Sequence, residues 1–171
     1  MKLKILCLLV LPILLLPVLL LSCSKTPTST VDYSKKFNTV DECGISMTQK
    51  AMSLTKKYEY GGVCIQGTDK KFYGSIPVTH KEIANVKYQL YLLPGTKIAA
   101  IYHTHPEGEY STFYSNVDIL NVKKMKVLSY LGIMQDKTIR VFKQGFYVKT
   151  CDLEIGNFTI ACADGLILKT L

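Results

Sequence analysis

The sequence predicts a mixed α/β domain in which one sheet has a helix on each side. Three features indicate this class: an amphipathic helical pattern over 40–56, a continuous apolar run at Lys97–Tyr102 (KIAAIY), and a second helical pattern after Ser115. Short β-type runs separated by turn residues lie between and after them. An order of helix, hairpin, strand, helix and strands is typical of one sheet layered with helices, and the 171 residues show no internal repeat.

The first half of the predicted domain is a helix followed by a hairpin. The stretch Thr39–Glu42 has a capping-box signature, and the apolar spacing after it predicts a helix over Val40–Lys56. Two β-type runs, 60–66 and 71–76, surround Gly67–Lys70, which has the composition of a turn. We therefore expect these two runs to pair as a hairpin.

The second half is organised around a buried strand and a helix. The strand is Lys97–Tyr102, because a continuous apolar run is expected where both faces of a strand are covered. The ambiguous segment before it contains a candidate strand at 88–92. Ser115 is the expected N-cap of the helix, which should end near Gly132. The apolar face of this helix would comprise Val117, Leu120, Val122, Met125, Leu128 and Leu131.

The C-terminal part is predicted to be made of short strands. They are expected at 133–134, 138–142 and 146–150, with turn residues between them. A last hairpin should follow through Asp164–Gly165 to Leu168. These strands would complete the sheet.

The first residues are interpreted as targeting sequence rather than as part of the fold. An apolar run over 3–22 follows a positively charged start, which is the composition of an export signal; an uncleaved membrane anchor is the alternative. Leu20–Cys23 resembles the lipobox of bacterial lipoproteins, and this resemblance implies that 1–22 is a signal peptide and that Cys23 carries lipid. Ser24 replaces the aspartate that retains such lipoproteins at the inner membrane. The implied location is the periplasmic face of the outer membrane.

The mature chain is predicted to be a short tether and one domain. Residues 23–40 are polar and contain proline, so they are expected to be a tether, and 41–171 to be the folded domain. The formal net charge of +8 favours contact with anionic surfaces such as membrane lipid or cell-wall polymer. The lysines are dispersed and no nucleic-acid-binding motif occurs, so nucleic acid is not an expected partner. The tract Lys123–Lys126 is interpreted as a solvated helix face.

Four cysteines lie in the predicted domain: Cys43, Cys64, Cys151 and Cys162. In an oxidising compartment an even set indicates disulfides, and four cysteines allow three pairings. A turn at 155–158 would place Cys151 and Cys162 on facing strands, which leaves Cys43 to pair with Cys64; buried free thiols are the alternative. No CxxC pair occurs, so a zinc–thiolate site is not expected.

The strongest chemical signal is HTHP at His103–Pro106, directly after the buried strand. In an extended chain, side chains two apart point to the same side, so both imidazoles can face one metal ion. A catalytic zinc typically has three protein ligands and a water, and Asp118, in the first turn of the predicted helix, is a suitable third ligand. A solvated His-x-His pair is the plain alternative, but the joint occurrence of strand, HTHP and SxxD is more specific. His80 has no partner at ligand spacing and is interpreted as a surface residue.

These motifs resemble those of the JAB/MPN (JAMM) metal-dependent hydrolases, whose pattern is an upstream glutamate, then H-[ST]-H-P, then S-x-x-D. The chain has HTHP at 103–106 and SNVD at 115–118, with EYGG at 59–62 as in bacterial JAB-like domains. The loop before the serine is longer than is common in the family. The resemblance covers about 41–149 and implies a JAB/MPN-like (cytidine deaminase-like) fold, with a central mixed sheet flanked by helices. The C-terminal β-hairpin would be an extension of it.

The resemblance also implies a role for each matching residue. His103, His105 and Asp118 would hold one zinc ion (Zn²⁺). Glu59 would be the general base and then the general acid, and Ser115 would help to hold the oxyanion. The plain alternatives are a solvated helix-end carboxylate for Glu59 and an N-cap for Ser115.

The predicted function is hydrolysis of peptide or isopeptide bonds at the bacterial cell envelope. The substrate would be a peptide, a protein or cell-wall material, and the membrane would be contacted through the lipid anchor. The alternative is a non-catalytic binding or immunity-type lipoprotein with the same fold. Glu82 is the other upstream acid in a comparable context, but it lacks the Tyr-Gly-Gly that follows Glu59.

Overall fold

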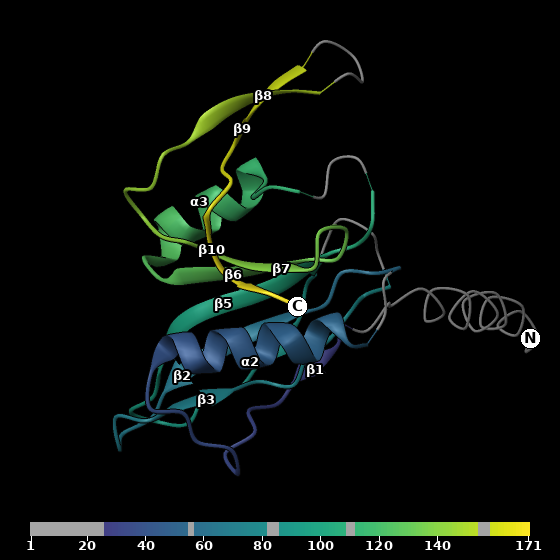
Figure 1. The fold of residues 1–171 in the computed structure, drawn as a ribbon. Helices are drawn as coiled ribbons and strands as arrows, with labels where there is room; N and C mark the ends of the chain where they lie inside the picture. The colour runs from purple at the N-terminus through teal and green to yellow at the C-terminus, as the bar shows by residue number, and fades with distance from the viewer. Residues whose placement is uncertain (1–25, 55–56, 82–85, 109–111, 154–157) are drawn as a thin grey trace, which may run out of the picture.

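One six-stranded sheet organises the domain (Figure 1). The computed structural model describes residues 26–54, 57–81, 86–108, 112–153 and 158–171, and within 149–161 it describes the backbone only. The strand order in the sheet is β10-β7-β6-β5-β2-β3, and every neighbouring pair is antiparallel except β5 and β6, which are parallel. The strands are β2 (Gly61–Gln66), β3 (Phe72–Gly74), β5 (Lys97–His105), β6 (Leu128–Ile133), β7 (Thr138–Phe142) and β10 (Leu166–Thr170). The predicted mixed α/β class and the predicted hairpin of β2 and β3 are confirmed.

The first helix, α2 (Val40–Met52), covers one face of the sheet (Figure 1). Its capping box is the predicted one: the Thr39 side chain accepts from the backbone N–H of Glu42, and the Glu42 carboxylate accepts from the backbone N–H of Thr39. A Cβ at Gly44 would collide with the Tyr130 ring, so glycine allows the helix to approach β6 closely. The helix ends at Met52, earlier than predicted.

The second helix, α3 (Asn116–Met125), lies on the opposite face and connects β5 to β6 (Figure 1). The prediction that it continues to Gly132 is wrong. Lys126 takes a left-handed conformation with φ 56° and ends the helix without the glycine that usually marks such a cap. Leu128 and Leu131 continued the helical spacing in the sequence but belong to β6.

The predicted apolar face of α3 is correct for Val122 and wrong for its other helical members. Ile119 and Val122 are buried in the core, whereas Val117, Leu120 and Met125 are 64%, 53% and 40% exposed. The expected face was misplaced because Leu128 and Leu131, which belong to β6, were counted as part of the helix.

The C-terminal strands agree with the sequence in one pairing, because Cys151 and Cys162 lie on facing strands as expected, and differ from it in the next. β8 (Lys149–Leu153) and β9 (Phe158–Cys162) form a separate two-stranded antiparallel sheet beside α3 (Figure 1). The hairpin expected through Asp164–Gly165 is wrong, because β9 pairs with β8 while β10 pairs with β7. Gly165, at φ 71°, instead lets the chain pass from one sheet to the other. The strand expected at 133–134 is the end of β6.

The segment before α2 packs against the domain. β1 (Thr28–Ser29) pairs in parallel with β4 (Gln89–Leu90), Ser29 is buried, and Phe37 belongs to the core under α2. The folded region was expected to start near Asp41. The described residues before Asp41 belong to the folded domain as well, so that start is too late. Among the described residues no helix is long and apolar enough to cross a membrane, and the predicted signal peptide lies outside them.

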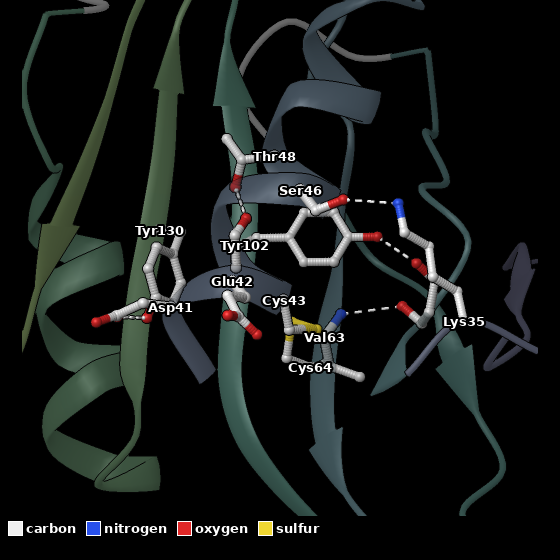
Figure 2. Close-up of a disulfide and its surroundings, with 12 residues drawn as sticks. Lys35, Asp41, Glu42, Cys43, Ser46, Thr48, Val63, Cys64, Tyr102 and Tyr130 are labelled. Atoms are coloured by element: carbon white, nitrogen blue, oxygen red, sulfur yellow. Dashed lines mark hydrogen bonds between the residues drawn. A yellow bond between two sulfur atoms is a disulfide. The ribbon is translucent and has the colours of Figure 1, made fainter. Parts of the chain in front are cut away.

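A disulfide joins α2 to β2 (Figure 2). It links Cys43 and Cys64, which are both fully buried and have a Cα–Cα distance of 6.2 Å. Cys162 is also disulfide-bonded, and the side chain of Cys151 lies outside the described part. The expected pairing of Cys43 with Cys64 is thus confirmed.

Replacing both Cys43 and Cys64 with alanine should lower the free energy of unfolding by about 3 kcal/mol, because the crosslink closes a loop with a sequence separation of 21 residues. Urea unfolding of the oxidised proteins measures this difference. Under reducing conditions the wild-type protein also loses the crosslink, so the difference should shrink. Equal stability of the oxidised proteins would contradict a structural role for this disulfide.

Candidate metal centre

Two histidines at the carboxyl end of β5 face the same side of the sheet. His103 and His105 alternate with Thr104, and their Nε2 atoms are 3.2 Å apart. β5 extends past the predicted end at Tyr102 because β6 pairs with it as far as His105. The strand geometry therefore positions both imidazoles on the face that α3 covers.

Asp118 approaches this pair from the first turn of α3. Its Oδ1 is 3.1 Å from Nε2 of His103, and its Oδ2 is 3.7 Å from Nε2 of His105. Ser115, the N-cap, donates to Oδ2 from its backbone N–H at 2.8 Å and from its hydroxyl at 2.7 Å. Two hydrogen bonds from one residue thus orient the carboxylate toward the imidazoles.

Tyr114 fixes the position of the helix start. It is fully buried, its hydroxyl lies 2.7 Å from the carbonyl oxygen of Ser129 and 2.8 Å from that of Arg140, and its backbone N–H donates to Ala163. These contacts tie the residue before the N-cap to β6, β7 and the end of β9. No role was expected for Tyr114, since an aromatic residue in a loop has no periodic signal.

Glu59 reaches the cluster from the other side. It lies just before β2, is 8% exposed, and has Oε1 at 3.7 Å from Nε2 of His105. Thr104 holds this segment in place: its N–H donates to the carbonyl of Tyr60 at 2.9 Å, and its hydroxyl accepts from the N–H of Tyr60 at 3.0 Å. Side chains alternate along a strand, so the residue between two ligands faces away from them. The sequence therefore could have indicated that Thr104 points away from the metal group and supports the structure behind it.

Burial governs the ionisation of the cluster. Burial raises the pKa of Glu59, and the two imidazoles oppose that shift only in part. Burial also acts to raise the pKa of Asp118, but the imidazoles, His103 foremost, hold that pKa well below its usual range. Burial acts to lower the pKa of His103, yet the carboxylates of Asp118 and Glu59 leave it raised. Two carboxylates in so small a volume favour a compensating positive charge, from protons or from a metal ion.

The donor atoms lie close enough together to bind one metal ion. His103, His105 and Asp118 form a group that can bind a metal ion, each with one ligand atom, and these atoms lie within 4.8 Å of one another. Ligands at 2.0–2.1 Å from a tetrahedral zinc are about 3.3 Å apart, close to the separations found here. Glu59 lies beside this group without belonging to it.

A cleft of about 880 Å³ opens over the cluster. Glu59, His103, His105, Ser115 and Asp118 all line it, so all five residues singled out for a catalytic centre meet there. A substrate in this cleft would reach both the candidate ligands and the glutamate. The candidate centre is therefore accessible although its side chains are mostly buried.

The remaining sequence expectations lie away from the cleft. Lys123, Lys124 and Lys126 are exposed, in agreement with a solvated helix face. The interpretation of His80 as a surface residue is correct only in part: the residue is half-buried, and its Nε2 is buried with no hydrogen-bond partner among the described residues. Glu82 lies outside the described residues.

Comparison with known protein families, with curated proteins and with solved structures finds no significant match. The interpretation of the centre therefore depends on the residues and distances described above. Those distances support metal binding by the three-residue group.

Protein purified without chelator should contain about one divalent metal ion per chain, and His105→Ala or Asp118→Ala should remove it, because each change deletes one of three ligands. Elemental analysis of the folded variants provides the measurement. His80→Ala is the matched control, since it removes a histidine outside the cleft and should leave the metal content unchanged. Retention of metal in both ligand variants would contradict the assignment.

Proposed function

We propose that the protein is a zinc-dependent hydrolase of peptide or isopeptide bonds with a JAB/MPN-like fold. The observation that carries this proposal is the position of Glu59: a buried carboxylate beside, but outside, a three-residue metal-binding group in an open cleft. A metal with three protein ligands and a nearby carboxylate is the arrangement of a hydrolytic zinc site. The order HTHP on β5, SxxD at the start of α3 and a glutamate before β2 matches the family pattern.

The chemistry can be divided between the ion and the chain. Bound zinc would supply Lewis acidity, which polarises a carbonyl group and lowers the pKa of a water toward ~7. Glu59 takes one proton from the attacking water as the carbon–oxygen bond forms, and it returns that proton to the amine nitrogen as the carbon–nitrogen bond breaks. Burial raises the pKa of this carboxyl group. A higher pKa makes the carboxylate a better base toward the water and lets it hold the proton until the amine leaves.

Ser115 acts chiefly through Asp118. Its hydroxyl has one proton, which is directed at Oδ2 of Asp118. A role in holding the oxyanion, as the family resemblance implies, requires that proton to turn away from the carboxylate. The hydrogen bonds in the structure support a positioning role for Ser115 instead.

We also propose that the protein is a lipoprotein anchored through Cys23 and exported to the cell envelope. The chain is pinned to the cleft wall soon after that residue, since Pro27 accepts a hydrogen bond from the N–H of Gln89 at 2.9 Å. Four residues of extended chain span at most about 14 Å. A lipid on Cys23 would therefore hold the cleft close to the membrane surface.

Glu59→Gln should leave zinc content and folding unchanged while turnover falls by about 10²–10⁴-fold, because the amide keeps the size of the side chain but cannot accept the proton. Turnover is measured on peptides, isopeptides and cell-wall fragments with metal-loaded protein. Glu107→Gln, a change to another carboxylate that lines the cleft, is the matched control and should retain activity. Full turnover in Glu59→Gln would refute the proposed mechanism, and binding of these substrates without turnover by the wild-type protein would favour the non-catalytic alternative.

Cys23→Ala should abolish palmitate labelling and leave an unprocessed precursor in bacterial cells, because the thiol is the proposed site of lipidation. Labelling of the wild-type protein and of Cys7→Ala provides the comparison. Unchanged labelling in Cys23→Ala would refute the lipid anchor.

A further inference from the structure

The cleft extends well beyond the metal centre along the sheet. α3 packs on β6 and β9, so it borders the face of β2 and β5 that carries the histidines. The segment 86–90 borders the cleft on the other side. Val63 of β2 and Ile98 and Ile101 of β5 also line the cleft, and these three residues are called its floor.

This extension is apolar. Val63 is 2% exposed, Ile98 and Ile101 are half-buried, and Tyr88 and Leu90 from the bordering segment pack with them. Outside the cluster of Glu59, the histidines and Asp118, Glu107 is the one charged side chain among the lining residues that the structure describes, and these residues include no lysine or arginine. An acidic side chain placed here would lose its hydration and gain no cation in return.

The exposed residues of α3 agree with this character. Val117 and Met125 are 64% and 40% exposed, and both line the cleft rather than the core. When a substrate covers a large apolar side chain on a cleft wall, apolar area is removed from water. The burial of this area adds to the free energy of binding. The cleft thus accounts for the exposure of Val117 and Met125, two of the three exposed apolar residues of α3, whereas Leu120 does not line it.

The volume exceeds what the hydrolytic centre needs. A cleft of about 880 Å³ lies at the upper end of the range of ~300–1,000 Å³ that is typical of ligand pockets. It accommodates several residues of a chain rather than one small group. A chain with small or charged side chains suits an apolar floor poorly, because it buries little apolar area or leaves its charges without partners.

We propose that the apolar extension of the cleft selects a polypeptide with a bulky aliphatic or aromatic side chain beside the bond to be cut. This inference rests on the proposed hydrolase and names its substrate class as a protein segment rather than a cell-wall peptide. The floor residues determine specificity, whereas the metal group and Glu59 act on the bond itself.

Binding is tested first, with zinc-loaded Glu59→Gln protein and fluorescent alanine-based hexapeptides that differ at one position. Peptides with leucine or phenylalanine there should bind on the order of tenfold more tightly than those with alanine or glutamate, as burial of one large apolar side chain implies. Ile98→Ala should reduce this preference. Ile167→Ala is the matched control, because Ile167 is an equally large side chain on β10 that is 54% exposed and outside the cleft. Equal binding of all peptides, or a preference that Ile98→Ala leaves intact, would overturn the inference.

Cleavage is tested next, by mass spectrometry of a peptide library digested with wild-type protein and with Glu59→Gln, beside purified cell-wall peptides. Cleavage that depends on Glu59 should occur next to bulky apolar residues. Glu59-dependent cleavage without that preference, or of cell-wall peptides alone, overturns the substrate class and leaves the hydrolase standing. Selective apolar binding without Glu59-dependent cleavage supports the specificity of the cleft and refutes the proposed hydrolase.

Discussion

The parallel pairing of β5 with β6 is the constraint on which the rest of the structure depends. Parallel neighbours cannot be joined by a tight turn, so the chain must cross over the sheet between them, and α3 makes that crossing. The crossing starts beside the carboxyl end of β5, where His103 and His105 lie. Asp118, in the first turn of α3, consequently faces the two imidazoles, and the candidate centre is a direct result of the strand connection.

Burial of several charged groups in one place is the second constraint. Ser115 orients the carboxylate of Asp118, and Thr104 holds the backbone of Tyr60, the residue after Glu59, so hydrogen bonds within the chain position both acids near the imidazoles. The ionisation of the cluster does depend on positive charge, because desolvation opposes each isolated charge. The cluster of two acids and two histidines holds its side chains in fixed positions for catalysis. The apolar cleft beside it can bind a substrate through the hydrophobic effect.

Much of the fold was predictable from local patterns, and the errors have identifiable causes. The capping boxes of α2 and α3, the hairpin of β2 and β3, and the strand β7 follow from short-range sequence signals. The end of α3 was wrong because Lys126, rather than a glycine, takes the left-handed conformation. The strand β6 was missed because it is buried on both faces, and a short continuous apolar run has no periodicity that separates strand from helix.

The sequence by itself determined the chemistry that is available: two histidines at strand spacing, a capped helix with an aspartate in its first turn, and a glutamate before a Gly-Gly strand. These are local patterns, and the backbone periods of two and 3.6 residues convert them into directions of side chains. Only the tertiary structure decided that Glu59 meets the histidines, that β10 returns to β7, and that Val117 and Met125 face a cleft. Each of these depends on pairing or packing between residues far apart in the chain, where the free energy of burial, and not the local conformational preference, selects the neighbour.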